Sequence, residues 1–162
     1  MVQTGTNAGN ARRSDTTDAS KARLRLWLRV LKSTRRVEAE LRERFRTEFD
    51  TTLPRFDVMA ALDRFEAGLK MSALSDVLRV SNGNVTGIVD RLAADGLVVR
   101  VPVPGDRRAS LVRLTRKGRE EFARQAQAHE AWIAALLSDF STEEADRLSA
   151  RFDATTQKDG QP

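Results

Sequence analysis

The stretch from Ser81 to Gly96, SNGNVTGIVDRLAADG, restricts the fold of this chain more than any other segment. Serine is favoured just before a helix, and glycine is favoured just after one. Between these two residues, apolar side chains recur at the three- and four-residue spacing of a single helical face. The apolar residues are Val85, Ile88, Val89 and Leu92. The segment therefore predicts a short helix with one buried face and one exposed face.

The exposed face of this helix has an unusual composition. At 100° per residue it presents Gly83, Thr86, Gly87, Asp90 and Arg91, with Asn82 and Asn84 in the first turn. An exposed glycine inside a helix costs about 1 kcal/mol relative to alanine. Glycine also removes side-chain bulk, so the helix could approach the floor of a DNA major groove, about 12 Å wide, very closely. The alternative is a surface helix that tolerates poor helix formers.

A basic β-hairpin is predicted directly after this helix. The runs LVVRVPV and SLVRLT have the composition of short strands, and PGDRRA between them is typical of a turn. Arg107 and Arg108 at the tip suit contacts with the phosphate backbone or the minor groove, with Asp106 able to brace a neighbouring arginine. A solvated pair of loop charges is the alternative interpretation.

Positive charge is concentrated in the same region. The stretch from Arg79 to Arg119 has nine basic and three acidic residues, whereas the whole chain has a net charge of only +5. Eight of the nine are arginine, whose planar fork fits phosphate oxygens and guanine edges. This concentration favours a polyanionic partner, although a merely solvated basic surface has the same composition.

Several classes of protein are disfavoured by the composition. With no cysteine and one histidine, the chain cannot form a disulfide or a thiolate zinc site, and no acidic cluster suggests a metal ion or a cofactor. No nucleophile with a base, carboxylate pair or phosphate-binding loop suggests an enzyme. The sequence contains no apolar run of about 18 residues and no secretory signal, so we expect a cytoplasmic protein.

The flanking regions are predicted to be helical and to form a dimer. Apolar residues recur at helical spacing over residues 21–50, and Thr115 and Ser141 are suited to cap two further helices. Because these helices need a surface on which to bury their apolar stripes, we expect a homodimer. We divide the chain into a disordered tail (1–20), an N-terminal dimerisation helix (21–50), a DNA-binding domain (51–118), C-terminal dimerisation helices (119–157) and a tail (158–162).

The order of helices, the segment SNGNVTGIVDRL and above all GDRRASLVRLTRKG resemble the MarR family of bacterial regulators over about residues 21–155. The wing signature of that family is matched at its spacing by Asp106, Arg108, Leu114, Thr115 and Gly118. The resemblance implies a mainly α fold with a small β-hairpin wing, in which a winged helix-turn-helix lies between N- and C-terminal dimerisation helices. It also implies that the helix after Ser81 enters the major groove.

Two departures from the family pattern limit what the resemblance implies. Lys70 stands where many relatives have a capping threonine or serine, and Gly87 stands where a longer polar side chain often reads DNA. The base specificity of relatives is therefore not transferred. The candidate DNA-binding residues are Ser81, Asn82, Asn84, Thr86, Gly87, Arg91, Arg107 and Arg108.

The resemblance also implies regulation by a small aromatic acid, phenol or acyl thioester. The candidate ligand-binding residues are Trp27, Leu31, Arg35, Phe56 and Met59, an apolar set with one cation that could hold a carboxylate. Core packing is the alternative for the apolar members. His129 lies on an apolar helical face, where it could be a hydrogen-bonded interface residue or a pH-sensitive element.

The resulting hypothesis is a sequence-specific DNA-binding transcriptional regulator, expected to be a repressor, that acts as a homodimer. Its operator should be a near-palindrome with half-sites about one helical turn apart, roughly 34–36 Å. The alternative function is a winged-helix module that binds proteins and has no specific affinity for DNA.

Overall fold

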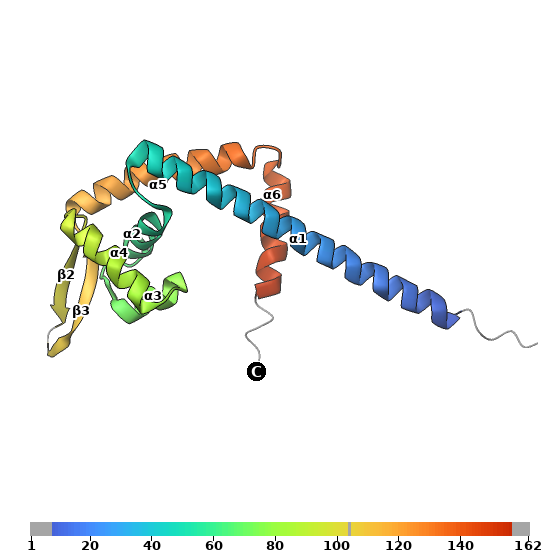
Figure 1. Ribbon diagram of the computed structural model, residues 1–162, viewed down its shortest axis with the longest axis horizontal. Helices are drawn as coiled ribbons and strands as arrows, with labels where there is room; N and C mark the ends of the chain where they lie inside the picture. The colour runs from blue at the N-terminus through green and yellow to red at the C-terminus, as the bar shows by residue number, and fades with distance from the viewer. Residues whose placement is uncertain (1–7, 104, 157–162) are drawn as a thin grey trace, which may run out of the picture. The chain divides into compact units, whose positions relative to one another are not determined.

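The computed structural model describes residues 8–103 and 105–156, without the side chains of residues 8–17, 106–109 and 156. Two compact units make up the chain, Met1–Glu40 and Leu41–Pro162, and helix α1 (Ala8–Phe49) runs from the first into the second (Figure 1). The predicted disordered tail over residues 1–20 is wrong from Ala8 onward, because α1 already begins there. A helix that has nucleated can extend through residues that carry no apolar stripe. Residues 1–7 and the predicted tail at 158–162 lie outside the described residues.

Five further helices follow in the described part of the second unit. They are α2 (Leu53–Arg64), α3 (Met71–Leu78), α4 (Asn82–Ala94), α5 (Arg116–Leu136) and α6 (Thr142–Thr156). Pro54 lies in the first turn of α2, where its missing N–H does no harm. The backbone N–H of Gly118 donates to the Thr115 hydroxyl at 2.9 Å, so Thr115 caps α5 as predicted. No helix in the described part of the chain combines the length and apolarity needed to cross a membrane.

A three-stranded antiparallel sheet forms the wing. Its strands are β1 (Leu69–Lys70), β2 (Val98–Val103) and β3 (Asp106–Leu114), in the order β1-β3-β2 (Figure 1). The β2–β3 hairpin confirms the sequence prediction, although β3 begins within the predicted turn. Gly105 permits this tight connection because its φ of +84° is one that residues with side chains rarely adopt. The two residues of β1 carry no periodic signal, and the sequence did not predict them.

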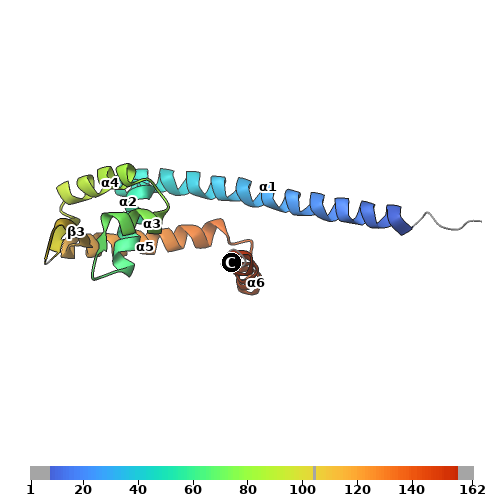
Figure 2. The same cartoon turned by 90° about the horizontal axis from the view of Figure 1, so that it is seen from below.

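The core of the second unit lies between α2, α3, α4 and the sheet. Val85, Val89 and Leu92 of α4 are fully buried, which confirms the apolar stripe predicted for that helix. They pack with residues of the other elements, including Val58, Met59, Leu62, Leu74 and Val112. Helix α2 contacts both α4 and α5, and Figure 2 shows α4 and α5 on opposite sides of this unit. The core therefore holds one face of α4 and leaves the other face outside.

Candidate nucleic-acid interface

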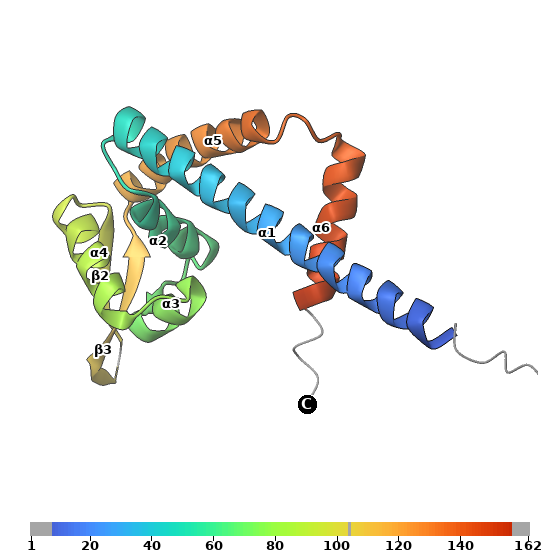
Figure 3. The ribbon, with the colours of Figure 1, turned by 45° about the vertical axis from the view of Figure 1, so that its right-hand side comes forward.

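The turn that leads into α4 is fixed by a buried hydroxyl. Arg79 ends α3 in the left-handed conformation, with φ +53°, and the chain turns over three residues before α4 begins (Figure 3). Buried Ser75 of α3 donates a hydrogen bond to Oδ1 of Asn82 at 2.5 Å. Ser81 occupies the predicted N-cap position, but its side chain makes no capping hydrogen bond. The start of α4 is held by Asn82 instead.

The outer face of α4 carries the exposed residues that the sequence selected. Ser81, Asn82, Asn84, Thr86, Gly87 and Arg91 are all exposed. The Thr86 hydroxyl donates to the Asn82 carbonyl within the helix, at 2.8 Å. A Cβ atom added at Gly83 or Gly87 would meet no atom within 4 Å. Nothing in the described chain therefore requires glycine at these two positions.

An ion pair joins α4 to the wing. Nη2 of Arg100, on β2, lies 2.6 Å from Oδ1 of Asp90, on α4. Both side chains remain partly open to solvent, with exposed fractions of 40% and 53%. The sequence predicted Asp90 on the outer face of α4 but gave no partner for its carboxylate. Asp90 and Arg100 are ten residues apart and lie in different elements, so the local sequence pattern does not predict their contact.

The C-terminal end of α4 is fixed to α2 and α5. Asp95, which ends the helix, forms an ion pair with Arg55 of α2, and its backbone carbonyl accepts a hydrogen bond from Nζ of Lys117 at 2.8 Å. The Thr115 hydroxyl donates to the carbonyl of Gly96 at 2.7 Å. Gly96 has a φ of +72°, as the predicted helix stop requires. Helix α4 is thus held at both ends and along its inner face.

The wing tip completes the predicted surface. Arg107 and Arg108 belong to β3 at the end of the hairpin, but their side chains lie outside the described residues. Their contacts with DNA stay a prediction.

A cavity of about 660 Å³ opens beside α4. Its apolar lining comes from Leu53, Pro54, Leu78, Val80 and Ile88, and its polar lining from Arg42, Arg46, Thr51, Thr52, Asp57, Asn84 and Arg91. Such a volume is typical of small-molecule sites. Two of the candidate DNA-reading side chains, Asn84 and Arg91, therefore also line a cavity.

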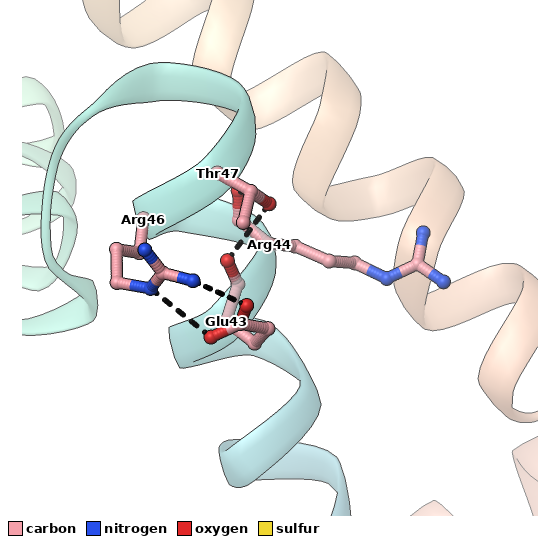
Figure 4. A network of polar contacts seen from close by, with 4 residues as sticks. All are labelled: Glu43, Arg44, Arg46 and Thr47. Atoms are coloured by element: carbon pink, nitrogen blue, oxygen red, sulfur yellow. Dashed lines mark hydrogen bonds and ion pairs between the residues drawn. The ribbon is translucent and has the colours of Figure 1, made fainter.

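The α1 side of the cavity is a polar network near the end of that helix (Figure 4). Arg46 makes two hydrogen bonds with the Glu43 carboxylate, from Nε at 3.1 Å and from Nη2 at 2.6 Å. Arg46 holds the pKa of Glu43 below its usual value mainly through these hydrogen bonds. Arg44 extends away from this pair, and its guanidinium carbon lies 5.8 Å from the centre of the Trp132 ring.

None of the predicted ligand-binding residues belongs to the lining of this cavity. Phe56 and Met59 are buried in the second unit, with exposed fractions of 7% and 1%, whereas Trp27 and Arg35 are exposed in the first unit. Leu31 is partly buried in the first unit. The proposed ligand cleft lined by these five residues stays a prediction. Sequence spacing did not identify the cavity, because its walls come from four helices and the turns between them.

An aromatic cluster joins the end of α1 to α2 and α5. The Phe45 ring centre lies 4.7 Å from that of Phe56 and 5.1 Å from that of Trp132. His129 packs against both phenylalanines, at 6.1 Å from Phe45 and 4.8 Å from Phe56, and burial lowers its pKa. The sequence predicted His129 on the inner face of α5, but it did not predict buried Trp132, which packs against Phe45.

Comparisons with known proteins agree with this arrangement. The model of the MarR family matches residues 49–109. The chain is 36% identical over 111 residues to the transcriptional activatory protein BadR of Rhodopseudomonas palustris, an alignment that covers 67% of this chain and 58% of BadR. It is 34% identical over 97 residues to the HTH-type transcriptional regulator PecS of Dickeya dadantii, covering 59% of this chain and 58% of PecS. The chain thus spans less than two thirds of the length of these relatives.

Solved structures are matched over more of their length. The crystal structure of a MarR family transcriptional regulator from Silicibacter pomeroyi has a TM-score of 0.72 and 34% identity, covering 87% of this chain and 97% of that one. A mutant of MarR from E. coli, solved in complex with operator DNA, has a TM-score of 0.70 and 26% identity, covering 80% of this chain and 92% of that one.

Proposed function

Because the chain belongs to the MarR family, whose members are transcriptional regulators rather than enzymes, we propose that it is a regulator that binds duplex DNA through α4 and the wing. The observation that carries this proposal is the outer face of α4. It is exposed and fixed at both ends, and it carries two glycines that nothing in the described chain explains. A helix presented in this way can enter the major groove and bring its first turns to the base edges.

The basic wing supports the same interface. The hairpin follows α4 directly, and Arg107 and Arg108 at its tip supply two cations for the phosphate backbone or the minor groove. The structure of E. coli MarR with operator DNA is a precedent for a related chain with a similar fold. Contacts from α4 supply base specificity in this proposal, and wing contacts supply affinity that depends on salt.

The active form in this proposal is a homodimer. In the first unit of the chain, helix α1 exposes four large apolar side chains, with exposed fractions of 54–59%. Helix α6 exposes Leu148 and Phe152. These side chains would bury their surface in a subunit interface, and a two-fold dimer would read a near-palindromic operator with half-sites about one turn apart.

Release by a small molecule is part of the proposal. The cavity beside α4 combines an apolar lining with three arginines and one aspartate, and this net positive lining suits an organic anion. A ligand in this cavity would contact the side chains of Asn84 and Arg91, and these side chains would then not be available to bind DNA. Fluorescence anisotropy of labelled DNA, measured while aromatic acids, phenols or acyl thioesters are added, tests whether such ligands release the DNA.

Selection of bound sequences from a random duplex pool tests the function as a whole. We expect a near-palindrome, protected symmetrically in a footprint. Replacement of Arg91 by alanine should change the preference at one base pair per half-site by about 1–3 kcal/mol. Replacement of Arg108 should weaken binding to all duplexes and reduce the salt slope by up to about one unit per phosphate contact.

The competing function is a winged-helix module that binds only proteins. It predicts weak binding to every duplex, with no sequence enriched by the selection. A single asymmetric half-site in the footprint would contradict the dimeric arrangement, and a monomer at micromolar concentration would contradict the interface.

A further inference from the structure

One acidic residue stands on the face of α4 that is proposed to meet DNA. Asp90 is the only carboxylate in the helix, and it follows Gly83 and Thr86 along the same exposed stripe at seven- and four-residue spacings. An uncompensated carboxylate on this stripe would repel the phosphates on either side of the groove. The face therefore needs a means of removing that charge.

Arg100 provides the opposite charge at hydrogen-bond distance. Its Nη2 lies 2.6 Å from Oδ1 of Asp90, and it reaches α4 from the neighbouring strand β2. In the sheet, Arg100 is paired with Val112 of β3, so the backbone from which it extends is held by the hairpin. The guanidinium is thus placed by the wing and directed at the helix.

We propose that Arg100 is a positioning residue that neutralises Asp90 and ties the recognition helix to the wing, so that DNA meets a neutral pair at this point. This inference rests on the proposed function. It assigns to Arg100 a role different from that of the arginines at the wing tip, which are proposed to contact phosphates directly. It also predicts that Asp90 contributes no base reading of its own.

The ion pair between Asp90 and Arg100 should contribute little to the stability of the fold. Both side chains are about half exposed, and exposed ion pairs contribute little to folding. A variant that lacks Arg100 should therefore fold, which allows its DNA affinity to be interpreted.

A double-mutant cycle on the full chain tests the inference, with the selected operator as the probe and anisotropy as the measurement. R100Q should weaken binding by roughly three- to tenfold at low salt, because it leaves the Asp90 carboxylate unpaired near phosphates. D90N alone should not weaken binding, because it removes the carboxylate and leaves the Arg100 cation near the phosphates. The double variant D90N/R100Q should recover most of the loss, because both partners are then neutral.

The matched control is R124Q, which removes one positive charge from an exposed ion pair on α5, on the opposite side of the unit from α4 (Figure 2). It should leave operator affinity within about twofold of the wild type. Thermal melts of all the variants check that the fold is retained.

Two results would overturn the inference. If the D90N/R100Q variant binds as weakly as R100Q, and the salt slope is lower by about one unit in both, Arg100 contacts a phosphate directly. If D90N changes the selected sequence, Asp90 reads a base. Failure of the wild-type chain to bind any duplex would instead refute the proposed function, so the two failures can be told apart.

Discussion

Replacement of Gly87 by alanine should stabilise the protein and weaken its binding to DNA. The residue lies in the middle of α4 and is exposed, and a Cβ atom there would meet nothing within 4 Å. Alanine is favoured over glycine in such a position by about 1 kcal/mol. In a domain of this size, that gain raises the melting temperature by roughly 2–4 °C. The same change at Gly83, the second residue of the helix, should have a smaller effect because helix ends are less constrained.

The effect on DNA binding should have the opposite sign. If the backbone of α4 approaches the base edges closely at Gly87, an added methyl group must displace the helix or the DNA. Overpacking of a fitted contact costs about 1–3 kcal/mol, which corresponds to roughly five- to 150-fold in affinity. The two effects can be measured on one preparation, by thermal melts at fixed protein concentration and by anisotropy titrations with the operator.

A matched control separates helix propensity from the interface. Gln127 is exposed on α5, which lies on the opposite side of the unit from α4, and its replacement by alanine also improves helix propensity. This variant should gain a few tenths of a kcal/mol in stability with unchanged operator affinity. If the Gly87 variant is stabilised yet binds the operator as tightly as the wild type, glycine does not serve close approach and the reasoning fails.

Three further predictions concern stability. Replacement of Thr115 by alanine removes the cap of α5 and should destabilise the fold by about 1–2 kcal/mol in urea titrations, whereas unchanged stability would show that solvent replaces the cap. Replacement of Gly118 by alanine places a Cβ atom 1.9 Å from the carbonyl oxygen of Leu97, so it should cost more than about 2 kcal/mol, and a wild-type melt would contradict this packing. Burial lowers the pKa of His129, so the folded state binds its proton less readily than the unfolded state does. The protein should therefore lose stability as the pH falls from about 6.5, the pKa of His129 in the unfolded state, to its pKa in the folded state. The H129Q variant should lack this pH dependence in melts between pH 8 and 5.

The acidic groups act in a different range, which makes the histidine prediction specific. The carboxyls of Glu43 and Glu144 have lowered pKa values, through hydrogen bonds from Arg46 and from Ser141 respectively. A carboxyl whose pKa is lowered in the folded state contributes stability that is lost only as the pH falls below about 4.5, its unfolded value. A loss of stability between pH 6.5 and 5 that persists in the H129Q variant would therefore point to neither carboxyl and would refute the assignment.

The helices and the hairpin were predictable because their signals are local. The apolar stripe of α4, the proline at the start of α2 and the Thr115 cap each depend on residues within about one or two helical turns. The same reasoning failed at the start of α1, because residues 8–20 lack the apolar pattern on which the prediction relied, although α1 already begins at Ala8. It also missed β1, which has only two residues and exists because β3 offers it a partner.

The contacts that fix the candidate site were not predictable, because they join residues distant in sequence. Arg55 and Asp95 are separated by 40 positions, and Lys117 reaches the carbonyl of Asp95 across 22. The cavity beside α4 has walls from four helices, so no single segment encodes it. Composition indicated that arginines would gather in this region, but only the fold distinguishes those that hold the scaffold from those left facing outward.

That distinction narrows the set of residues available to read DNA. Asn82 accepts a hydrogen bond from Ser75, and the Thr86 hydroxyl is committed to the backbone of its own helix. Asn84 and Arg91 are the long polar side chains of α4 for which the described chain shows no such bond, and asparagine and arginine are suited to adenine and guanine edges. These two residues lie seven positions apart, about two helical turns, and so share one side of the helix. Discrimination between bases should therefore depend mainly on Asn84 and Arg91. The two glycines of α4 should contribute by allowing close approach to the DNA, and the wing by its positive charge.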